Sequence, residues 1–525
     1  MSPTPSDPDT RSTDPRGPSK ISRKGFLGAA GAGAAAAALG GVGTAEAAAT
    51  QEAARVERTD VVVVGAGMGG LTAAVRAQEQ GADVVLLEKA SEPGGTMRES
   101  EGVVWTYGSY DEIRANIPDG DPDLQRTVFD MLPTVYEFYE GLRAPISPRG
   151  GDRSRQIAPV AFTNLLVGLF QRDGGTLLVD TPMVRLLTNP RHEVIGVLAD
   201  SPDGPVNYLA NAVILATGGW AGNAAMVNHH ITRHFGSLYQ RNCGFNGLQP
   251  ALTGDGYWAA SAVGAAPSQG GFDSFYGHVL PARPARFTHP LGNYSIYHGQ
   301  WTVTVNLEGV RFTDESRGKV RGRDVRAGEQ IVCQEIARQP EATAAYIWDE
   351  PINQDQALAE NNLGDFDKFD AFRDAGAPVA RANSLEELAD QMERWGRGIP
   401  ASRVLETIRE YNGAAENGRA WALPVPKGNS EYARPIDEPP FYAVLGTTGI
   451  TGPHGGLKAN TEGQILSRGG RPIPGLYAAG IDIGGIGNYV YMGFLCYGAV
   501  FGYIAGANAA AQPEPAGGWE ISPFA

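Results

Sequence analysis

Cysteine is scarce in this chain, which has three among 525 residues, and they stand far apart as Cys243, Cys333 and Cys496. This spacing excludes a paired-cysteine zinc site, a CxxC redox pair and a CxxCH haem attachment. Positive charge is also in short supply, because 43 Lys and Arg face 58 Asp and Glu, for a formal net charge of -15. Such a balance argues against binding to the phosphate backbone of nucleic acid. We therefore expect no nucleic acid partner and no metal.

Long apolar runs are missing beyond the N-terminal segment, so we expect no transmembrane helix in the mature protein. That segment, "SRKGFLGAAGAGAAAAALGGVGTAEAAAT", has a basic pair, an Ala/Gly run and an "AEA" site, which is the pattern of an export signal. It resembles a twin-arginine signal in Ser22, Arg23, Phe26 and Leu27, with Lys24 in place of the second arginine. We expect residues 1–47 to be a cleaved signal and the protein to be exported. The alternative is a disordered Ala-rich tail.

The glycines point to a ligand. Val61 to Val64 is a β-branched run typical of a strand buried in a parallel sheet, and Gly65, Gly67 and Gly70 follow it in a G-x-G-x-x-G pattern. The first glycine allows a tight turn, the second lets a pyrophosphate approach the backbone, and the third lets helix pack on strand. A helix over 71–80 and a strand "DVVLLEK" complete the unit, with Glu88 placed to meet a ribose hydroxyl. The unit alone does not distinguish NAD from FAD.

The next segment, "SEPGGTMRESEGVVW", makes that distinction by resemblance. It is similar to the flavin-contacting loop of the fumarate reductase and succinate dehydrogenase flavoproteins, with Gly94, Gly95, Thr96 and Ser100 in matching places. The resemblance implies FAD as the cofactor. Family members with covalent flavin have a histidine here, and this stretch has none, so FAD is expected to be noncovalent.

The resemblance continues along almost all of the chain after the signal. Its further motifs are "NAVILATGGWAGN", "TGDGYWAASAVGA", "LEGVRFTDES", "ANSLEELADQ", "LETIREYNGAAENG", "PFYAV" and "GGLKANTEGQILSRGGRPIPGLYAAG". It implies an α/β fold: a Rossmann-like FAD-binding domain with a doubly wound parallel sheet and an inserted α+β capping domain. We expect the FAD-binding domain at 58–270 and 438–510, the cap at 271–437 and a loose tail at 511–525. Residues expected to hold FAD are Gly65, Gly67, Met68, Gly69, Gly70, Glu88, Lys89, Gly94, Gly95, Thr96, Ala216, Thr217, Gly218, Asp255, Gly480, Asp482 and Leu495.

The chain departs from the soluble fumarate reductases at their cationic anchors. Where those enzymes are expected to place a proton-donating arginine, after "AAYIWDEPINQ", this chain has Asp349 to Ile352. Their N-R-L-G-G becomes "NYVYMG", which puts Tyr489 in the place of the substrate-binding arginine. A dicarboxylate would then lack bidentate partners. Some cations remain close in sequence: Arg311, Arg317, Arg321 and Arg323. An anionic substrate is therefore disfavoured but stays open.

Phenols stand where the cations are lost. By analogy with the 3-ketosteroid dehydrogenases, a tyrosine exchanges a proton while the flavin N5 exchanges hydride with the neighbouring carbon. The candidate catalytic residues are Tyr489, Tyr491, His454 and Arg311. Tyr489 is the first choice; Tyr497 is expected to be a packing residue, and His454 either orients substrate or caps a loop. A cap group suits a pocket for a neutral ring or an ordinary core: Tyr276, His278, His289, Tyr294, Tyr297, His298 and Trp301.

The sequence thus predicts an FAD-dependent oxidoreductase acting on a CH–CH or C=C bond next to an activating group of a largely neutral substrate, which can be cyclic. A membrane or soluble electron partner is expected. One alternative is a fumarate-reductase-like reductase of a carboxylated alkene, and another is a flavin electron carrier without catalysis. The substrate, the direction of the reaction and the oligomeric state stay open.

Overall fold

The computed structural model describes residues 55–240, 252–288, 291–320, 323–324, 327–355 and 367–523. The expected export signal lies outside these ranges, as do Cys243, His289 and Arg321. Within them, no helix has the length and apolar character needed to cross a membrane.

The valine run at 61–64 forms the inner end of strand β1 (Arg55–Val64), and all four valines are buried. Parallel neighbours flank β1 on both sides, with Val63 opposite Leu86 of one strand and Ile214 of the other. A strand in such a position needs apolar side chains on both faces. The main sheet runs in the order β18 (Gln464–Leu466), β19 (Pro472–Ala478), β9 (Gly204–Leu215), β1, β2 (Val84–Leu87) and β6 (Thr176–Leu178), with β8 (Val194–Ser201) and β7 (Met183–Thr188) continuing from β9.

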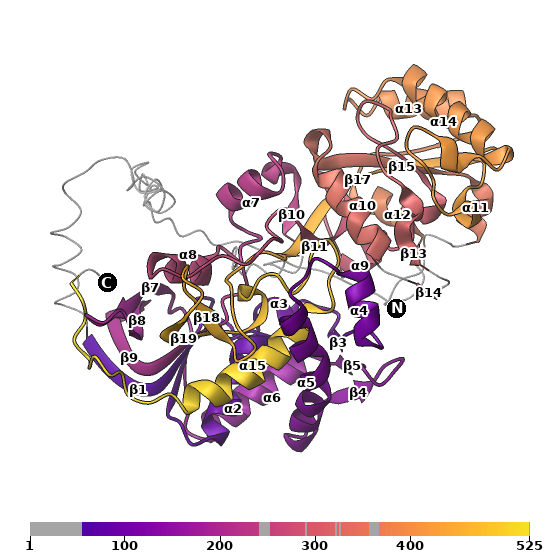
Figure 1. Ribbon diagram of the computed structural model, residues 1–525. Coiled ribbons are helices and arrows are strands. Elements are labelled where there is room, and N and C mark those ends of the chain that lie inside the picture. The colour runs from indigo at the N-terminus through magenta and orange to yellow at the C-terminus, as the bar shows by residue number, and fades with distance from the viewer. Residues whose placement is uncertain are drawn as a thin grey trace, which may run out of the picture. The chain divides into compact units, whose positions relative to one another are not determined.

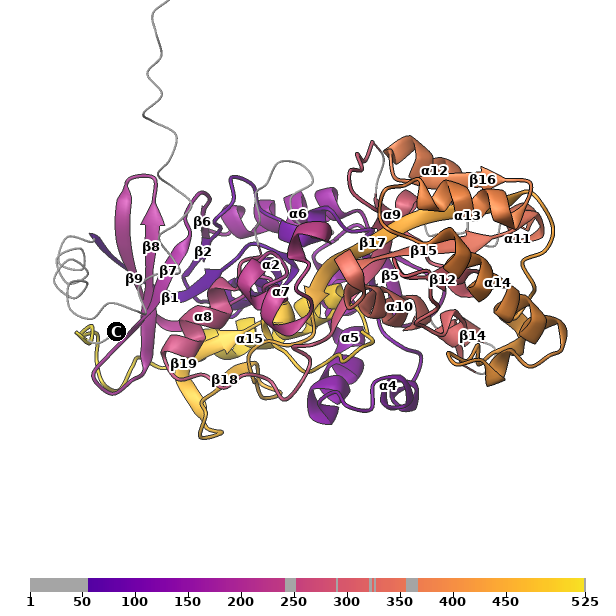
Figure 2. The same ribbon diagram turned by 90° about the horizontal axis from the view of Figure 1, so that it is seen from above.

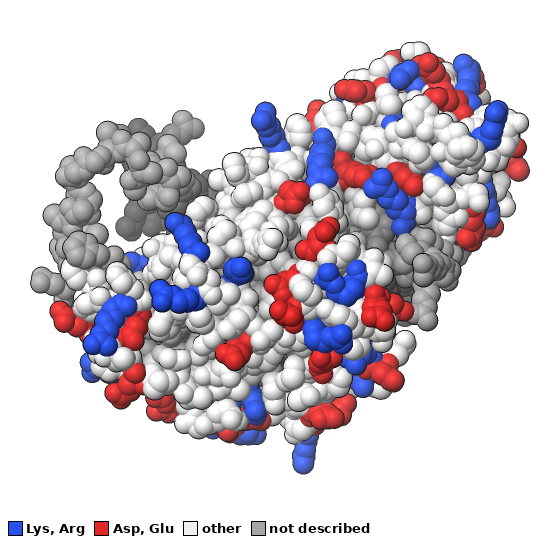
Figure 3. Space-filling model, in the orientation of Figure 1, with Lys and Arg blue, Asp and Glu red and all other residues white. Residues whose placement is uncertain are grey.

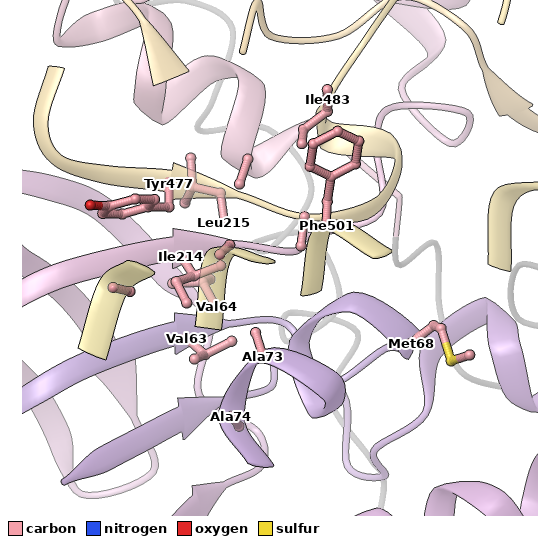
Figure 4. Packing of buried hydrophobic residues seen from close by; sticks show 14 of the residues in the cluster. Val63, Val64, Met68, Ala73, Ala74, Ile214, Leu215, Tyr477, Ile483 and Phe501 are labelled. Atoms are coloured by element: carbon pink, nitrogen blue, oxygen red, sulfur yellow. The ribbon is translucent and has the colours of Figure 1, made fainter. Parts of the chain in front are cut away.

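Two helices pack closely beside the main sheet, α2 (Met68–Glu79) and α15 (Phe494–Ala510) (Figure 1). A Cβ on Gly502 of α15 would lie 2.5 Å from the Gly69 carbonyl oxygen of α2, and one on Gly506 would lie 2.5 Å from that of Ala73. The absence of these side chains lets the helices approach closely. The buried cluster between helices and sheet includes Val63, Ile214, Tyr477 and Phe501 (Figure 4). The N-terminal ends of both helices line one cavity, which is the candidate site.

The cap has its own sheet and its own core. Its central strand is β17 (Phe441–Pro453), which lies in the midst of the cap elements in Figure 2. Paired with β17 are β10 (Tyr239–Gln240), β11 (Phe275–Pro281), β15 (Thr343–Trp348) and β16 (Val379–Ala382), and β12 (Val303–Val305) pairs with β15. A second buried cluster, which includes Phe275, Tyr346 and Trp348, fills this region.

The remaining elements surround these sheets. A small sheet consists of β3 (Val103–Trp105), β5 (Ser154–Ile157) and β4 (Ile146–Pro148), and β13 (Lys319–Val320) pairs with β14 (Arg323–Asp324). The other helices are α3 (Gly95–Arg98), α4 (Tyr110–Asn116), α5 (Pro122–Gly141), α6 (Pro159–Arg172), α7 (Ala224–His230), α8 (Asp255–Ala262), α9 (Leu291–Tyr294), α10 (Ala327–Ala337), α11 (Glu350–Gln354), α12 (Lys368–Ala375), α13 (Leu385–Glu393) and α14 (Ala401–Glu416).

The predicted α/β fold with a parallel sheet is confirmed, and two expected features differ. Strand β17, expected to open the return to the FAD-binding domain, is the central strand of the cap sheet. The C-terminal segment, expected to be loose, is attached: Trp519 and Ile521 pack against Leu187 and Leu209, and Ser522 N donates to the Thr188 carbonyl at 2.8 Å. One aromatic and one aliphatic side chain, Trp519 and Ile521, thus hold this segment in place although Pro, Ala and Gly surround them.

Candidate active site

A cavity that opens to solvent lies where β1, α2 and α15 meet the cap. It brings together most of the residues expected to hold a dinucleotide, although they come from segments far apart in the chain. Those that line it are Gly65, Gly67, Met68, Gly69, Glu88, Lys89, Gly95, Thr96, Ala216, Thr217, Gly218, Asp255, Gly480 and Leu495. The carboxyl ends of parallel strands supply several of them, which is where ligands bind in sheets of this type.

The three glycines of the turn have different surroundings. Gly65 has φ of 101°, and a Cβ there would lie 2.3 Å from the Ala216 carbonyl oxygen. A Cβ on Gly70 would lie 1.7 Å from the Gly65 carbonyl oxygen, so helix α2 packs directly on the turn. A Cβ on Gly67 would meet no protein atom within 4 Å. The first and third glycines are therefore needed by the fold, whereas the second leaves room on the cavity side.

Glu88 ends β2 and lies across the turn. Its carboxylate accepts hydrogen bonds from the Ala66 N–H at 2.8 Å and from the Ala90 N–H at 2.9 Å. Burial raises the pKa of this carboxyl group, and the two backbone donors oppose that effect. Glu88 thus holds the turn in shape and presents its carboxylate to the cavity, where a ribose hydroxyl would be a fitting donor.

Lys89 connects the two sides of the same end of the cavity. Its Nζ donates to Asp255 Oδ2 at 2.7 Å and to Thr253 Oγ1 at 2.8 Å. Asp255 is the first residue of α8, as the T-G-D-G motif predicted. The cation is therefore paired and held in place.

Helices α2 and α15 both point their N-terminal ends at the cavity, with Met68 and Leu495 in its wall. A helix N-terminus carries partial positive charge and unpaired N–H groups, so it favours anions such as phosphate. Neither first turn contains an acidic side chain that would occupy these groups.

Three predicted cofactor residues support the wall from behind. Gly94 N donates to the Ala66 carbonyl at 2.8 Å, and Gly70 packs on Gly65. Asp482 is buried and accepts hydrogen bonds from the N–H groups of Thr217 and Gly219 and from the Thr217 hydroxyl. We expected these residues to contact the cofactor, but the structure gives them the task of shaping the loops that line the cavity.

Asp482 predicts a pH dependence of stability. Burial raises its pKa to about 6, so between about pH 4 and pH 6 the folded chain keeps a proton that the unfolded chain releases. This contribution to stability is present at low pH and is lost as the pH rises through 6, by about 3 kcal/mol in total. We expect Asp482→Asn to remove it. Denaturant unfolding of both flavin-free proteins from pH 4 to 7 measures the difference, and identical pH profiles would contradict the assignment.

The residues that line this cavity have the chemistry needed to bind FAD. The open space at Gly67, the two converging helix N-termini and the carboxylate of Glu88 match a pyrophosphate and a ribose in chemistry and in order. The same cavity extends well past them, which leaves room for a flavin ring.

The far wall of the cavity is aromatic. Tyr491 stacks on Tyr276 of the cap, with ring centroids 3.7 Å apart and an angle of 18° between the rings. Trp105 and Phe494 each meet Tyr491 edge to face, at 5.5 and 5.3 Å. Tyr297 also lines the cavity, and its hydroxyl donates to Glu101 Oε1 at 3.1 Å. This wall suits a planar, largely apolar ligand.

Tyr489 does not join this wall, which corrects its expected place. Its hydroxyl donates to Asp273 Oδ2 at 3.1 Å, and its ring lies 5.7 Å from the Arg338 guanidinium, outside the cavity. Tyr491 lines the cavity instead, two residues before Gly493. That glycine has φ of 97°, and its Cβ would lie 2.2 Å from the Trp105 carbonyl oxygen.

His454 and Arg311 are also placed away from the cavity wall. His454 is buried against Phe494, neither ring nitrogen has a hydrogen-bond partner among the described residues, and burial lowers its pKa to about 3. It is a neutral packing group. Arg311 is buried in the cap and donates to both carboxylate oxygens of Glu315, at 3.1 and 2.6 Å. Neither residue faces a substrate.

We expect Arg311→Met to lower the free energy of unfolding by about 3 kcal/mol, because Glu315 would stay buried with only Lys427 at 3.9 Å as a cationic neighbour. FAD should still bind at low temperature. Arg317→Met is the matched control, since the side chains of its pair with Glu335 are 47% and 23% exposed and the pair should contribute less than about 1 kcal/mol. Denaturant unfolding followed by flavin absorbance compares them. Lost turnover at unchanged stability would restore a catalytic role for Arg311.

The other cap residues named in the sequence analysis are divided between the cavity and the interior of the cap. Asp349 accepts hydrogen bonds from the N–H groups of Asp437 and Glu438 and does not line the cavity, so a cation missing there removes no contact with a ligand. Tyr276 and Tyr297 reach the cavity. Tyr294 packs in a small cluster with Leu280, and Trp301 packs on Tyr432. Trp105, Glu101 and Phe494 also line the cavity but were not predicted as site residues. Their position next to the glycine motifs in the sequence could have indicated them.

The fold and the cavity define a dinucleotide-binding protein of the flavoprotein type. The family model described as "FAD binding domain" matches residues 60–139 and 139–493. The chain belongs to this family, and FAD is its cofactor. Relatives include a probable fumarate reductase of Shewanella frigidimarina, 25% identical over 86% of this chain and 75% of that protein. A vinyl phenol reductase of Lactiplantibacillus plantarum is 28% identical over 85% of this chain and 95% of that protein.

Among solved structures, a 3-ketosteroid delta1-dehydrogenase of Sterolibacterium denitrificans matches with a TM-score of 0.68 at 20% identity, over 87% of this chain and all of that chain. This likeness supports the fold. The predicted family and cofactor are confirmed, as is the predicted class, an FAD-dependent oxidoreductase acting on a CH–CH group.

Proposed function

We propose that the chain transfers hydride at a C=C or CH–CH bond next to a carbonyl or other activating group of a largely neutral, ring-bearing substrate. One observation carries this proposal. The cavity that starts at the glycine turn ends in an aromatic wall, and among its described lining residues Lys89 is the only cation. Lys89 is already paired with Asp255, at 2.7 Å. A carboxylated substrate would need free cationic partners.

Glu101 adds to this preference. Its carboxylate lies in the wall and accepts from the Tyr297 hydroxyl, so an incoming carboxylate would meet a like charge. A hydroxyl or a carbonyl has no such cost. The vinyl phenol reductase among the relatives is named for a neutral, ring-bearing alkene.

The chain's own residues divide the work as follows. Gly67, Glu88 and the N-termini of α2 and α15 would hold FAD, and FAD when bound supplies or accepts hydride. Trp105, Tyr491 and Phe494 would pack on the substrate ring and exclude water. A phenol of the wall exchanges the proton, because a tyrosine with a pKa near 10 becomes an acid or base once a neighbour polarises it. Tyr491 is the predicted tyrosine that lies there, with Tyr276 stacked on it.

The proposal is tested with purified, FAD-loaded protein under anaerobic conditions. The flavin is reduced with dithionite and mixed with enones, ring ketones, vinyl phenol, fumarate or urocanate, and its visible absorbance is followed. We expect reoxidation by a neutral alkene and not by fumarate. Preferential reoxidation by fumarate or urocanate would favour the alternative, a reductase of carboxylated alkenes that uses arginines whose side chains are not described, such as Arg321 and Arg323. Reduction of oxidised flavin by a saturated ketone would set the direction as dehydrogenation.

We also propose that residues 1–47 export the folded, FAD-loaded protein, and that a membrane or soluble partner exchanges electrons with it. The support is the match at Ser22, Arg23, Phe26 and Leu27. On the face seen in Figure 3, acidic and basic side chains are interspersed, so this face offers no single-sign field to steer a charged partner. A reporter fused to residues 1–50 should be exported, and Arg23→Gln should stop it. Equal export of both fusions would contradict the twin-arginine route.

A further inference from the structure

A chain of hydrogen bonds leads from the cavity wall into the cap. The Tyr276 hydroxyl lies 2.7 Å from His278 Nε2, and His278 Nδ1 lies 2.7 Å from Glu329 Oε1. Tyr276 lines the cavity, whereas the side chains of His278 and Glu329 are only 1% and 4% exposed. The first two residues belong to β11, and Glu329 lies in the first turn of α10. Two different elements therefore build one connected group.

We propose that Tyr276 is the catalytic residue that exchanges the proton with the substrate, and that His278 and Glu329 are positioning residues of a buried relay behind it. This inference rests on the proposed function and names the residues of its proton step. It also separates the two stacked phenols, since Tyr276 has the relay and Tyr491 is left to orient the substrate's activating group.

The imidazole of His278 can exchange a proton with Tyr276 because it lies between the phenol and the Glu329 carboxylate. When Glu329 accepts the Nδ1 proton of a neutral His278, Nε2 is left as an acceptor for the Tyr276 hydroxyl. When the ring is protonated, both nitrogens donate, and the carboxylate stabilises the imidazolium. The ring can therefore take a proton from Tyr276 or return one without any change of position.

The proton balance can be written in either direction. In reduction, the substrate's C=C bond takes a hydride, supplied by reduced FAD, on one carbon and the Tyr276 hydroxyl proton on the other. The phenolate oxygen then takes the Nε2 proton of the His278 imidazolium, and two electrons have passed from FAD to the substrate. In dehydrogenation, Tyr276 accepts the proton that leaves carbon while its own proton passes to His278, and the hydride would pass to oxidised FAD bound in the cavity.

Two other titratable groups, Lys368 and Tyr346, interact electrostatically with the Glu329 carboxylate. Lys368 is buried with its Nζ donating to the Asn293 carbonyl at 2.9 Å; burial lowers its pKa to about 8, and the charge of Glu329 opposes that change. Tyr346 lies on the other side, where burial and the same carboxylate raise its pKa. The Tyr297 ring lies 4.4 Å from the His278 ring and carries the bond to Glu101.

The test places 3-fluorotyrosine at position 276 of the full-length, FAD-loaded protein and records its ¹⁹F resonance together with turnover. We expect His278→Gln and Glu329→Gln each to shift this resonance, because both change the hydrogen bond at the phenol. Tyr346→Phe is the matched control, since it removes a buried phenol beside Glu329 without touching the relay, and it should leave the resonance in place. Tyr276→Phe should lower turnover by about 100-fold or more. The Glu329→Gln change should cost little once His278 is replaced, because the residues act as a unit.

The outcomes separate the relay from the proposed function. A ¹⁹F resonance that neither His278→Gln nor Glu329→Gln moves, or wild-type turnover in Tyr276→Phe, would overturn the relay. If the wild type holds FAD but exchanges electrons with no alkene, the proposed function fails, and the ¹⁹F shifts still decide whether the relay exists. Should His278→Gln not fold, Glu329→Gln in the fluorotyrosine protein makes the same comparison.

Discussion

Replacing Gly67 with alanine is expected to give a folded protein whose FAD affinity is lower by about 100-fold, or about 2.7 kcal/mol. The reason is the asymmetry of the glycine turn. A Cβ at this position meets no protein atom within 4 Å, so the fold should tolerate it. The same methyl group would stand in the open space that faces the cavity, where the pyrophosphate needs to approach the backbone. Circular dichroism and flavin fluorescence titration measure fold and affinity separately.

Gly70→Ala is the matched counterpart, with the same chemical change three residues along. Its Cβ would lie 1.7 Å from the Gly65 carbonyl oxygen. The helix and the strand would have to move apart and repack to remove this clash. We expect a loss of about 3 kcal/mol or more in unfolding free energy, or no folded protein. Wild-type affinity in Gly67→Ala, or a stable Gly70→Ala, would mean that the turn holds its ligand in some other way.

The second large effect is expected for Tyr491→Phe, which should lower kcat/KM by about 100-fold while FAD stays bound. The phenylalanine ring keeps the stacking on Tyr276 and the edge contact with Trp105, so only the hydroxyl is lost. A hydroxyl that binds the substrate's activating group contributes mainly in the transition state. Steady-state turnover with the best neutral alkene from the absorbance screen, together with the flavin spectrum, measures both properties.

Tyr489→Phe is the control, because that hydroxyl bonds Asp273 outside the cavity. It should turn over at the wild-type rate. The reverse result, a normal Tyr491→Phe and an inactive Tyr489→Phe, would restore the residue that the sequence alone favours and would require the cap to close in a different way.

The cofactor half of the site could be predicted from sequence because its determinants are local. A buried strand, a glycine turn, a helix and a second strand ending in Glu88 lie within one short stretch, and each glycine answers a steric demand of its immediate neighbours. The same holds for the start of α8 at Asp255. Such local patterns specify backbone geometry without any knowledge of distant contacts.

The substrate half was harder because its register depends on contacts across the fold. Gly493 has no room for a side chain, because a Cβ there would lie 2.2 Å from the carbonyl oxygen of Trp105, which belongs to the small sheet and is far away in the chain. Tyr491, two residues before this glycine, lines the cavity. Glu329 illustrates the same difficulty. It stands many residues after His278 and reaches it only because α10 packs on β11.

Two buried charged residues were predicted to lie in the site but do not line its cavity. Arg311 and Asp482 looked like site residues because charged groups in family motifs often are. Their real partners, Glu315 for the first and the Thr217 loop for the second, satisfy them inside the fold. Sequence shows that such a residue is present but not whether a partner has already taken its charge.

The most direct test of the whole account compares two acceptors that differ by one carboxylate group. Vinyl phenol and 4-hydroxycinnamate share a ring and a C=C bond, and the second adds a carboxylate. Reduced, FAD-loaded protein should be reoxidised by the first at least about 100-fold faster, as expected when an anion finds no free cation in the cavity wall. Faster reoxidation by 4-hydroxycinnamate would contradict the neutral-substrate account and point to cations supplied by the cap.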